Sequence, residues 1–286
     1  MGILMGLATM GLWGVAIFLA AVANKKLENV VVLFWMQIFG FILGIIYLLI
    51  KPVPLPLASI FHYLPQLILI ALLQIVAYLS FYRGLAKGQV SMVSAIGASW
   101  GLLTAILGVI FLNEVLKLNQ ILAIVLIALG IVLVSVNIKE LISNRKLKLL
   151  VGVQEGLIAM FSWGVALFFL ASLTKEIGWF LPAFLFRLFL LIFLSIFILF
   201  SKKKFVPAKT EFPWGLLLLI GFFDMGAFFT FSIGTSGSYA SIVAPIGSAY
   251  ALVTIILAKV FLKDKIKPNQ YLGIAGIIAG LIMISL

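Results

Sequence analysis

The sequence predicts an all-α integral membrane protein with ten transmembrane helices, arranged as two inverted five-helix repeats. Three observations predict this class: the composition, the length of the apolar runs and an internal repeat. The 286 residues are 65% hydrophobic and only 10% charged, whereas soluble domains average about 45–50% apolar and about 25% charged residues. The apolar residues form uncharged runs of about twenty, the length of α-helix that crosses roughly 30 Å of hydrocarbon.

Hydrophobic runs bounded by charged residues, glycine or proline define the ten expected spans. Those of the first half cover residues 2–23, 30–50, 62–82, 89–112 and 118–138. Those of the second half cover residues 152–173, 180–200, 212–233, 239–262 and 268–286. The longest polar stretches, 139–148 and 201–212, are too short for a soluble domain.

The internal repeat divides the chain into two copies. A shift of 150 residues aligns 2–136 with 152–286 without a gap, and 41 of the 135 aligned residues are identical. We therefore assign residues 1–138 to the first repeat, 139–151 to a linker and 152–286 to the second repeat. Each copy holds five spans, and this odd number turns the second copy upside down in the bilayer. Inverted repeats are typical of secondary transporters, whose binding site lies near the midplane between the halves.

Lysine and arginine are distributed unequally between alternate loops. The loops after odd-numbered spans hold fifteen of these residues, and the loops after even-numbered spans hold three. Because cytoplasmic loops carry the excess of positive charge, both termini are expected on the extracytoplasmic side of the cell membrane. The net charge of +12 is thereby explained by the membrane, and no nucleic-acid partner is expected.

Two motifs occur in both halves. A Trp-Gly pair lies in the middle of the first span of each copy, and GASWGLLTAILGVIFLNEVLKLNQ (97–120) corresponds to GSAYALVTIILAKVFLKDKIKPNQ (247–270). With these motifs, essentially the whole chain resembles the EamA branch of the drug/metabolite transporter superfamily. The resemblance implies a ten-helix transporter but no single substrate, because relatives carry amino acids, aromatic compounds, nucleotide sugars and other metabolites. Bacterial relatives usually have both termini in the cytoplasm, the opposite of what the loop charges predict here.

Sequence motifs of enzymes, metal sites and cofactors are absent. The chain has no cysteine, and its single histidine, His62, lies at a span boundary. Zinc sites and Ser/His relays at the bilayer centre are therefore not expected. Asp224 is the only carboxylate expected at that depth, which excludes catalysis by paired acids. We expect no enzymatic activity, no cofactor and no metal.

Two ionisable residues, Arg187 and Asp224, lie inside expected spans seven and eight. Antiparallel neighbouring helices would bring them within about one helical turn in depth, where they can form an ion pair. Their repeat equivalents are Gln37 and Gln74. The pair is interpreted either as a structural contact between two spans or as a group that binds substrate or couples a proton. Relatives often carry arginine at the position of Arg187, which favours the structural role for that residue.

Two repeat pairs of aromatic residues, Trp13 with Trp163 and Trp100 with Tyr250, are expected at mid-depth. Tryptophan and tyrosine of membrane proteins normally lie at the interfaces. Their position is therefore interpreted either as core packing or as the wall of a cavity for an organic or cationic solute.

Two further aromatic residues share helix faces with the polar positions, because Tyr78 follows Gln74 by four residues and Phe228 follows Asp224 by four. The predicted substrate-binding residues are Trp13, Gln74, Tyr78, Trp100, Trp163, Asp224, Phe228 and Tyr250.

The fourth span of each copy is rich in small and hydroxyl residues, which favours close helix packing. Pro245 removes one helical hydrogen-bond donor, so it predicts a hinge. The predicted hinge and packing residues are Pro245, Ser94, Gly97, Gly247 and Ser248. Glu114, in the loop after the fourth span, is expected to be solvated or to cap a helix.

The sequence as a whole favours a secondary transporter of a small organic metabolite, such as an amino acid or an amine, working by alternating access through a central cavity. No ATP-binding motif is present, so an ion gradient, for example of protons, or a solute gradient would supply the energy. A flippase for a lipid-linked headgroup is the alternative, and a channel or receptor is less favoured. Besides substrate and lipid bilayer, a homodimer through Gly276 and Gly280 stays open.

Overall fold

The computed structural model describes residues 1–87, 93, 96–135, 152–201, 204–206, 212–261, 263 and 268–285. Among these residues the regular structure is helical, with no strand. The first half contains α1 (Gly2–Ala23), α2 (Asn29–Ile50), α3 (Leu57–His62), α4 (Leu64–Lys87), α6 (Trp100–Phe111) and α7 (Leu118–Ser135). The second half contains α9 (Val153–Glu176), α10 (Phe180–Phe200), α11 (Trp214–Gly237), α12 (Ala240–Ser248), α13 (Tyr250–Phe261) and α14 (Pro268–Ser285).

Seven helical segments of the described chain are long and apolar enough to cross a membrane. They are α1, α2, α4, α9, α10, α11 and the combined segment Ala240–Phe261. The remaining three expected spans correspond to shorter apolar helices, Ile96–Phe111, Leu118–Leu133 and Pro268–Ile284. The structure also adds α3, a short helix that precedes the third expected span.

A hinge was expected only in the second half, at Pro245, and the fourth span of the first half was expected to be continuous; the structure corrects both points. In both halves the helix is interrupted at an equivalent residue, Ser99 and Ala249. There the backbone N–H bonds to the carbonyl three residues earlier, at Ile96 and Ile246, with N to O distances of 3.1 Å. Pro245 is present only in the second half and lies four residues before the break, so the proline alone is not its cause.

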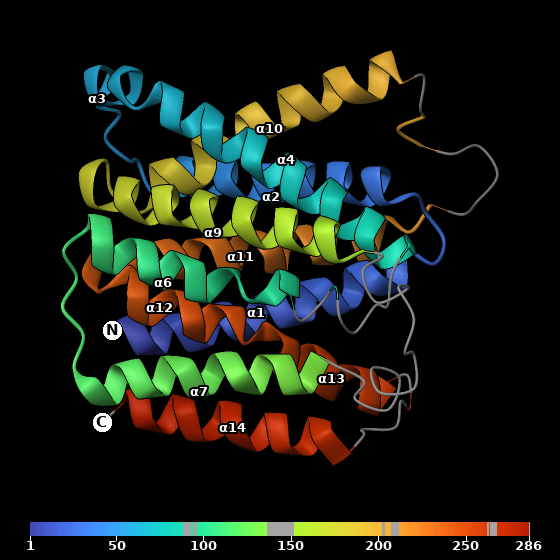
Figure 1. Ribbon diagram of the computed structural model, residues 1–286. Coiled ribbons are helices and arrows are strands. Elements are labelled where there is room, and N and C mark those ends of the chain that lie inside the picture. Colours follow the sequence, from blue (N-terminus) through green and yellow to red (C-terminus); the bar gives the residue numbers. More distant parts are fainter. Residues whose placement is uncertain are drawn as a thin grey trace.

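The helices pack as a bundle in which contacts between the halves come in equivalent pairs (Figure 1). α1 packs against α11, and its repeat equivalent α9 packs against α4, the equivalent of α11. In the same way, α2 contacts α11 while α10 contacts α4. The two halves are therefore interlocked around a pseudo-two-fold arrangement, and α7 and α14 pack against each other at one side of the bundle.

The first helices of the two halves run in opposite directions. Gly2 at the start of α1 packs against Ser238, which follows α11. Next to it, the side chain of Glu114 contacts both Ala240 at the start of α12 and Lys175 at the end of α9. The start of α1 and the end of α9 thus lie at the same end of the bundle, where Figure 1 also places the N- and C-termini.

Small residues permit close approaches between helices. A Cβ added at Gly280 of α14 would lie 2.7 Å from the side chain of Ile127 and 2.9 Å from the carbonyl oxygen of Ala123, both on α7. Gly276 also faces α7, against Gly130. This pair of glycines, considered above for packing or for a homodimer, therefore packs within the chain.

The residues predicted for hinge and packing lie in similar contacts at the centre of the bundle. A Cβ at Gly97 would lie 2.7 Å from Phe81, and a Cβ at Gly247 would lie 3.1 Å from Thr9. Ser248 packs against Gly101, so that α12 and α6 come together at the two helix breaks. Ser94 lies outside the described residues.

Candidate functional site

A cavity of about 580 Å³ lies between the two halves of the bundle. This volume is in the range of sites for small organic molecules, about 300–1,000 Å³. All eight residues predicted for substrate binding lie on its wall. They are joined there by Ala16, Ile17, Ala20, Ala21, Asn24, Lys25, Asn29, Met36, Phe81, Tyr82 and Leu167.

The aromatic residues of the wall pack edge to face in two equivalent groups. The ring of Trp13 lies 5.2 Å from that of Phe228 and 5.6 Å from that of Trp100, with interplanar angles near 90°. In the equivalent group the ring of Trp163 lies 5.3 Å from that of Tyr78, the equivalent of Phe228, again edge to face. Packing and cavity wall were alternatives for these residues. The structure combines them, because each ring is held by other rings and also lines the cavity.

The ion pair expected between Arg187 and Asp224 is present. The Nη2 of Arg187 donates to Oδ2 of Asp224 over 3.0 Å, and its Nη1 donates to Oε1 of Gln37. Arg187 is 0% exposed and Asp224 is 2% exposed. Only Asp224 lines the cavity, whereas Arg187 lies behind it with its guanidinium 5.1 Å from the ring of Phe228.

Gln37 and Arg187 are equivalent residues of the two repeats and they touch each other, so they lie near the pseudo-two-fold axis. An exact symmetry would also give Gln37 a bond to Gln74, the equivalent of Asp224. Instead, neither Oε1 nor Nε2 of Gln74 has a hydrogen-bond partner among the described residues, although Gln74 is 1% exposed. The two halves therefore differ at the centre: one offers a paired carboxylate and the other an unpaired carboxamide.

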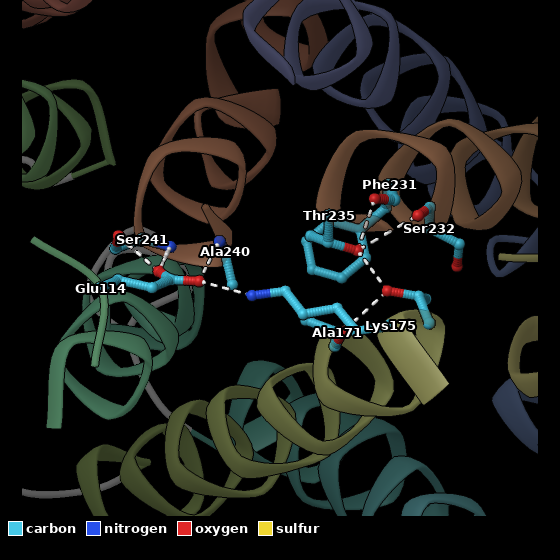
Figure 2. Close-up of polar contacts among 9 residues, drawn as sticks. Glu114, Ala171, Lys175, Phe231, Ser232, Thr235, Ala240 and Ser241 are labelled. Carbon is cyan, nitrogen blue, oxygen red and sulfur yellow. Dashed lines mark hydrogen bonds and ion pairs between the residues drawn. The ribbon is translucent and has the colours of Figure 1, made fainter. Parts of the chain in front are cut away.

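One end of the bundle is closed by a polar network around Glu114 (Figure 2). Its Oε1 accepts hydrogen bonds from the backbone N–H of Ala240, over 2.8 Å, and from Nζ of Lys175, over 3.2 Å. Its Oε2 accepts from the backbone N–H of Ser241, over 2.8 Å, and from the hydroxyl of Ser241, over 2.6 Å. Glu114 thus caps the N-terminus of α12, where unpaired N–H groups favour a negative charge.

The sequence interpretation of Glu114 was half right. Glu114 is 3% exposed, so it is not solvated, and the helix that it caps begins 126 residues later in the chain. An acidic residue directly after an apolar run was the only signal available. Nearby, the hydroxyls of Thr174 and Thr235 lie 3.3 Å apart and join the ends of α9 and α11 (Figure 2).

The cavity reaches the surface at the opposite end of the bundle. Its wall continues from Trp13 along α1 to Asn24 and Lys25 and to Asn29 at the start of α2. Lys25 is exposed. In this structure the cavity therefore opens where α1 ends, and it is closed where α1 begins.

Comparisons with known proteins agree with this architecture. The profile of the EamA-like transporter family matches residues 1–136 and again residues 150–286. An uncharacterized protein of Methanocaldococcus jannaschii is 33% identical over 139 residues, which are 47% of this chain and 96% of that protein. That relative is thus about as long as one half of the chain. A crystal structure of a protein with 14% sequence identity superposes with a TM-score of 0.79, over 99% of this chain and 95% of the other.

Proposed function

Since the chain belongs to the EamA-like transporter family and is a multi-pass membrane protein, we propose that it is a secondary transporter that moves a small organic solute by alternating access. The observation that carries this proposal is the cavity between the halves, open at one end of the bundle and closed at the other. A carrier requires such a compartment, which exposes its substrate to one side of the membrane at a time.

The proposed architecture has ten spans in two inverted repeats. Two features support it: the opposite directions of α1 and α9, and the equivalent packing of α1 with α11 and of α9 with α4. The interrupted fourth span of each half also supports the proposal. Interrupted helices at the repeat interface commonly form the substrate site of secondary transporters, and here Trp100 and Tyr250 follow the two breaks directly.

The network around Glu114 is the proposed gate of the closed end. Access from that end requires the start of α12 to separate from the loop after α6, and Glu114 then exchanges its four protein donors for water. Such an exchange has a small net cost, because hydrogen bonds to water replace those to the protein. A gate built from hydrogen bonds can therefore open and close, whereas a fully apolar seal of the same area would be harder to hydrate.

The distribution of lysine and arginine between the loops supports an assignment of the two ends of the bundle to the two sides of the membrane. The cavity mouth lies at the end that carries Lys25 and Lys26, in a loop after an odd-numbered span. Because cytoplasmic loops carry the excess of positive charge, we assign the mouth of the cavity to the cytoplasmic side and the gate of Glu114 to the extracytoplasmic side. We therefore propose that the structure is a state open to the cytoplasm.

Transport is tested with purified protein in proteoliposomes. A thermal-shift panel of amino acids, amines, sugars, nucleosides and lipid-linked headgroups first identifies compounds that bind the folded state. A labelled form of the stabilising compound is then offered to proteoliposomes preloaded with the unlabelled compound. A carrier gives saturable uptake that preloading accelerates, whereas linear uptake without counterflow would indicate a channel. Stabilisation only by lipid-linked headgroups would favour a flippase.

A further inference from the structure

The unpaired carboxamide of Gln74 identifies the part of the cavity that is built for a ligand. Both polar atoms of this side chain are buried, and neither has a hydrogen-bond partner in the described part of the chain. Buried amide groups are nearly always hydrogen-bonded, so an exception on the wall of a cavity requires a partner from outside the chain. The carboxamide carries two N–H donors on Nε2 and an acceptor, Oε1, and one of the donors lies beside the acceptor, so that the edge can form two parallel hydrogen bonds.

Among the residues that the structure describes, none forms a hydrogen bond with the carboxamide of Gln74. Its equivalent, Asp224, receives Nη2 of Arg187, and the residue that symmetry would offer to Gln74 is Gln37. The Oε1 of Gln37 is already engaged by Nη1 of the same arginine. The guanidinium of Arg187 therefore bonds to both Asp224 and Gln37. Among Arg187, Asp224, Gln37 and Gln74, only Gln74 is left without a bond to another member of this set.

The deep part of the cavity carries no unpaired charge among its lining residues. Asp224 is neutralised by Arg187 at 3.0 Å, and Arg187 itself does not reach the cavity wall. The other charged lining residue, Lys25, lies exposed at the mouth. A cation would have to compete with the guanidinium for Asp224, and an anion would find no buried positive charge facing it. The site therefore favours a neutral ligand.

The walls around Gln74 are aromatic. Tyr78 lies one turn further along the same face of α4, packed against Trp163. Trp13 and Phe228 form the equivalent pair, and each pair joins one residue of the first half to one of the second. Rings held rigidly by one another offer faces and edges on which a flat ring can stack. Shape and polarity thus indicate a planar molecule with few polar atoms apart from those that meet Gln74.

We propose that the ligand is a neutral planar heterocycle with a ring amide, an N–H next to a C=O, which pairs with both atoms of the Gln74 carboxamide. Nε2–H donates to the ring carbonyl, and Oε1 accepts from the ring N–H. Uracil, thymine, hypoxanthine, guanine and related lactams have this edge, and side-chain carboxamides elsewhere form a similar two-bond pair with another donor–acceptor edge, that of adenine. The inference rests on the proposed function and names the substrate class of the same site.

The first test compares ligands on the unaltered protein. Isothermal titration with uracil and hypoxanthine is compared with titration of 1,3-dimethyluracil and 1-methylhypoxanthine, which keep the ring and the carbonyl but lack the N–H. Because a site built to pair with an N–H leaves its acceptor unpaired when that group is missing, the parent compound should bind roughly 10- to 100-fold more tightly. Equal binding of parent and methylated compounds, or no binding of either parent, overturns the proposal.

The second test changes the protein. Gln74→Leu removes the carboxamide and should weaken uracil or hypoxanthine binding by roughly 10- to 100-fold, while abolishing the preference for the parent over the methylated ligand. Gln66→Leu is the matched control, on the same helix but not on the cavity wall, and should bind like the unaltered protein. If Gln74 had a merely structural role, its replacement would not abolish the preference for the parent over the methylated ligand. If Gln74→Leu fails to fold, the comparison of parent and methylated ligands on the unaltered protein still tests the proposal.

The outcomes separate this inference from the proposed function. If tetramethylammonium or an amino acid binds instead, and is taken up with counterflow, the inference fails while the transporter proposal stands. If uracil or hypoxanthine binds with the expected dependence on Gln74 but shows no counterflow in proteoliposomes, the ligand class stands and the transporter proposal fails.

Discussion

Replacing Asp224 by asparagine removes the negative partner of a fully buried arginine. The guanidinium of Arg187 is 0% exposed, and its charged contact is Oδ2 of Asp224 at 3.0 Å. Gln37 accepts a hydrogen bond from Nη1, and the ring of Phe228 lies 5.1 Å away, but neither carries a charge. The Asp224→Asn protein would therefore hold an uncompensated positive charge in the bundle interior.

The expected loss of stability is about 3–5 kcal/mol, the usual cost of removing one partner of a buried ion pair. Adding Arg187→Gln removes the stranded charge and gives the second half the two glutamine-like amides that the first half has at Gln37 and Gln74. The double variant should therefore return to within about 1 kcal/mol of the unaltered protein. Arg83→Gln is the control, because Arg83 is 69% exposed and lies 3.9 Å from Glu155. It should cost less than about 1 kcal/mol.

The measurement is the free energy of unfolding, in mixed micelles, of the unaltered protein, Asp224→Asn, Arg187→Gln and the double variant, analysed as a double-mutant cycle. Arg83→Gln is measured beside them as the control. A coupling energy near zero, or an Asp224→Asn protein as stable as the unaltered one, would refute the structural reading of the pair. If Asp224→Asn is stable and loses only pH-driven uptake while keeping counterflow exchange, the carboxylate instead couples a proton to transport.

Three further outcomes follow from the geometry of the bundle. Glu114→Gln should lower the free energy of unfolding by about 1–3 kcal/mol, because an amide replaces a buried carboxylate that accepts four hydrogen bonds; denaturant titration measures it. Trp163→Leu, on the cavity wall, should weaken ligand binding about tenfold, whereas Trp179→Leu, away from the cavity, should not. In intact cells, an impermeant thiol reagent should label Val115→Cys and spare Lys26→Cys. The chain has no native cysteine, so each variant carries a single thiol. The loop charges predict residue 115 on the extracytoplasmic side and residue 26 on the cytoplasmic side.

Each of these expectations has a contrary result. A Glu114→Gln protein of unchanged stability would mean that its network contributes nothing to the closed end. Equal effects of the two tryptophan replacements would assign both to general packing. Labelling of Lys26→Cys but not of Val115→Cys would reverse the proposed orientation and would agree with the usual orientation of bacterial relatives.

The sequence alone determined the class of the protein and much of the cavity wall. Composition and the length of apolar runs are properties of contiguous residues, and a shift of 150 residues revealed the repeat. Because polar and aromatic groups at mid-depth must face protein rather than lipid, the repeat pairs Trp13 with Trp163 and Gln74 with Asp224 could be assigned to the interior. The structure gathers all four around one cavity.

Tertiary structure decided which of those groups have partners. The sequence predicts the pair of Arg187 with Asp224, but no pattern in it shows that the same guanidinium also contacts Gln37, or that Gln74 has no partner among the described residues, because these contacts depend on how distant helices pack. The helix break at Ser99 was missed, and the break of the second half lies at Ala249 rather than at the predicted Pro245, since apolar periodicity continues through both positions. Glu114 caps a helix 126 residues away. Hydrophobic burial is non-directional and can be read from composition, whereas hydrogen bonds and ion pairs depend on distances that only the packed helices fix.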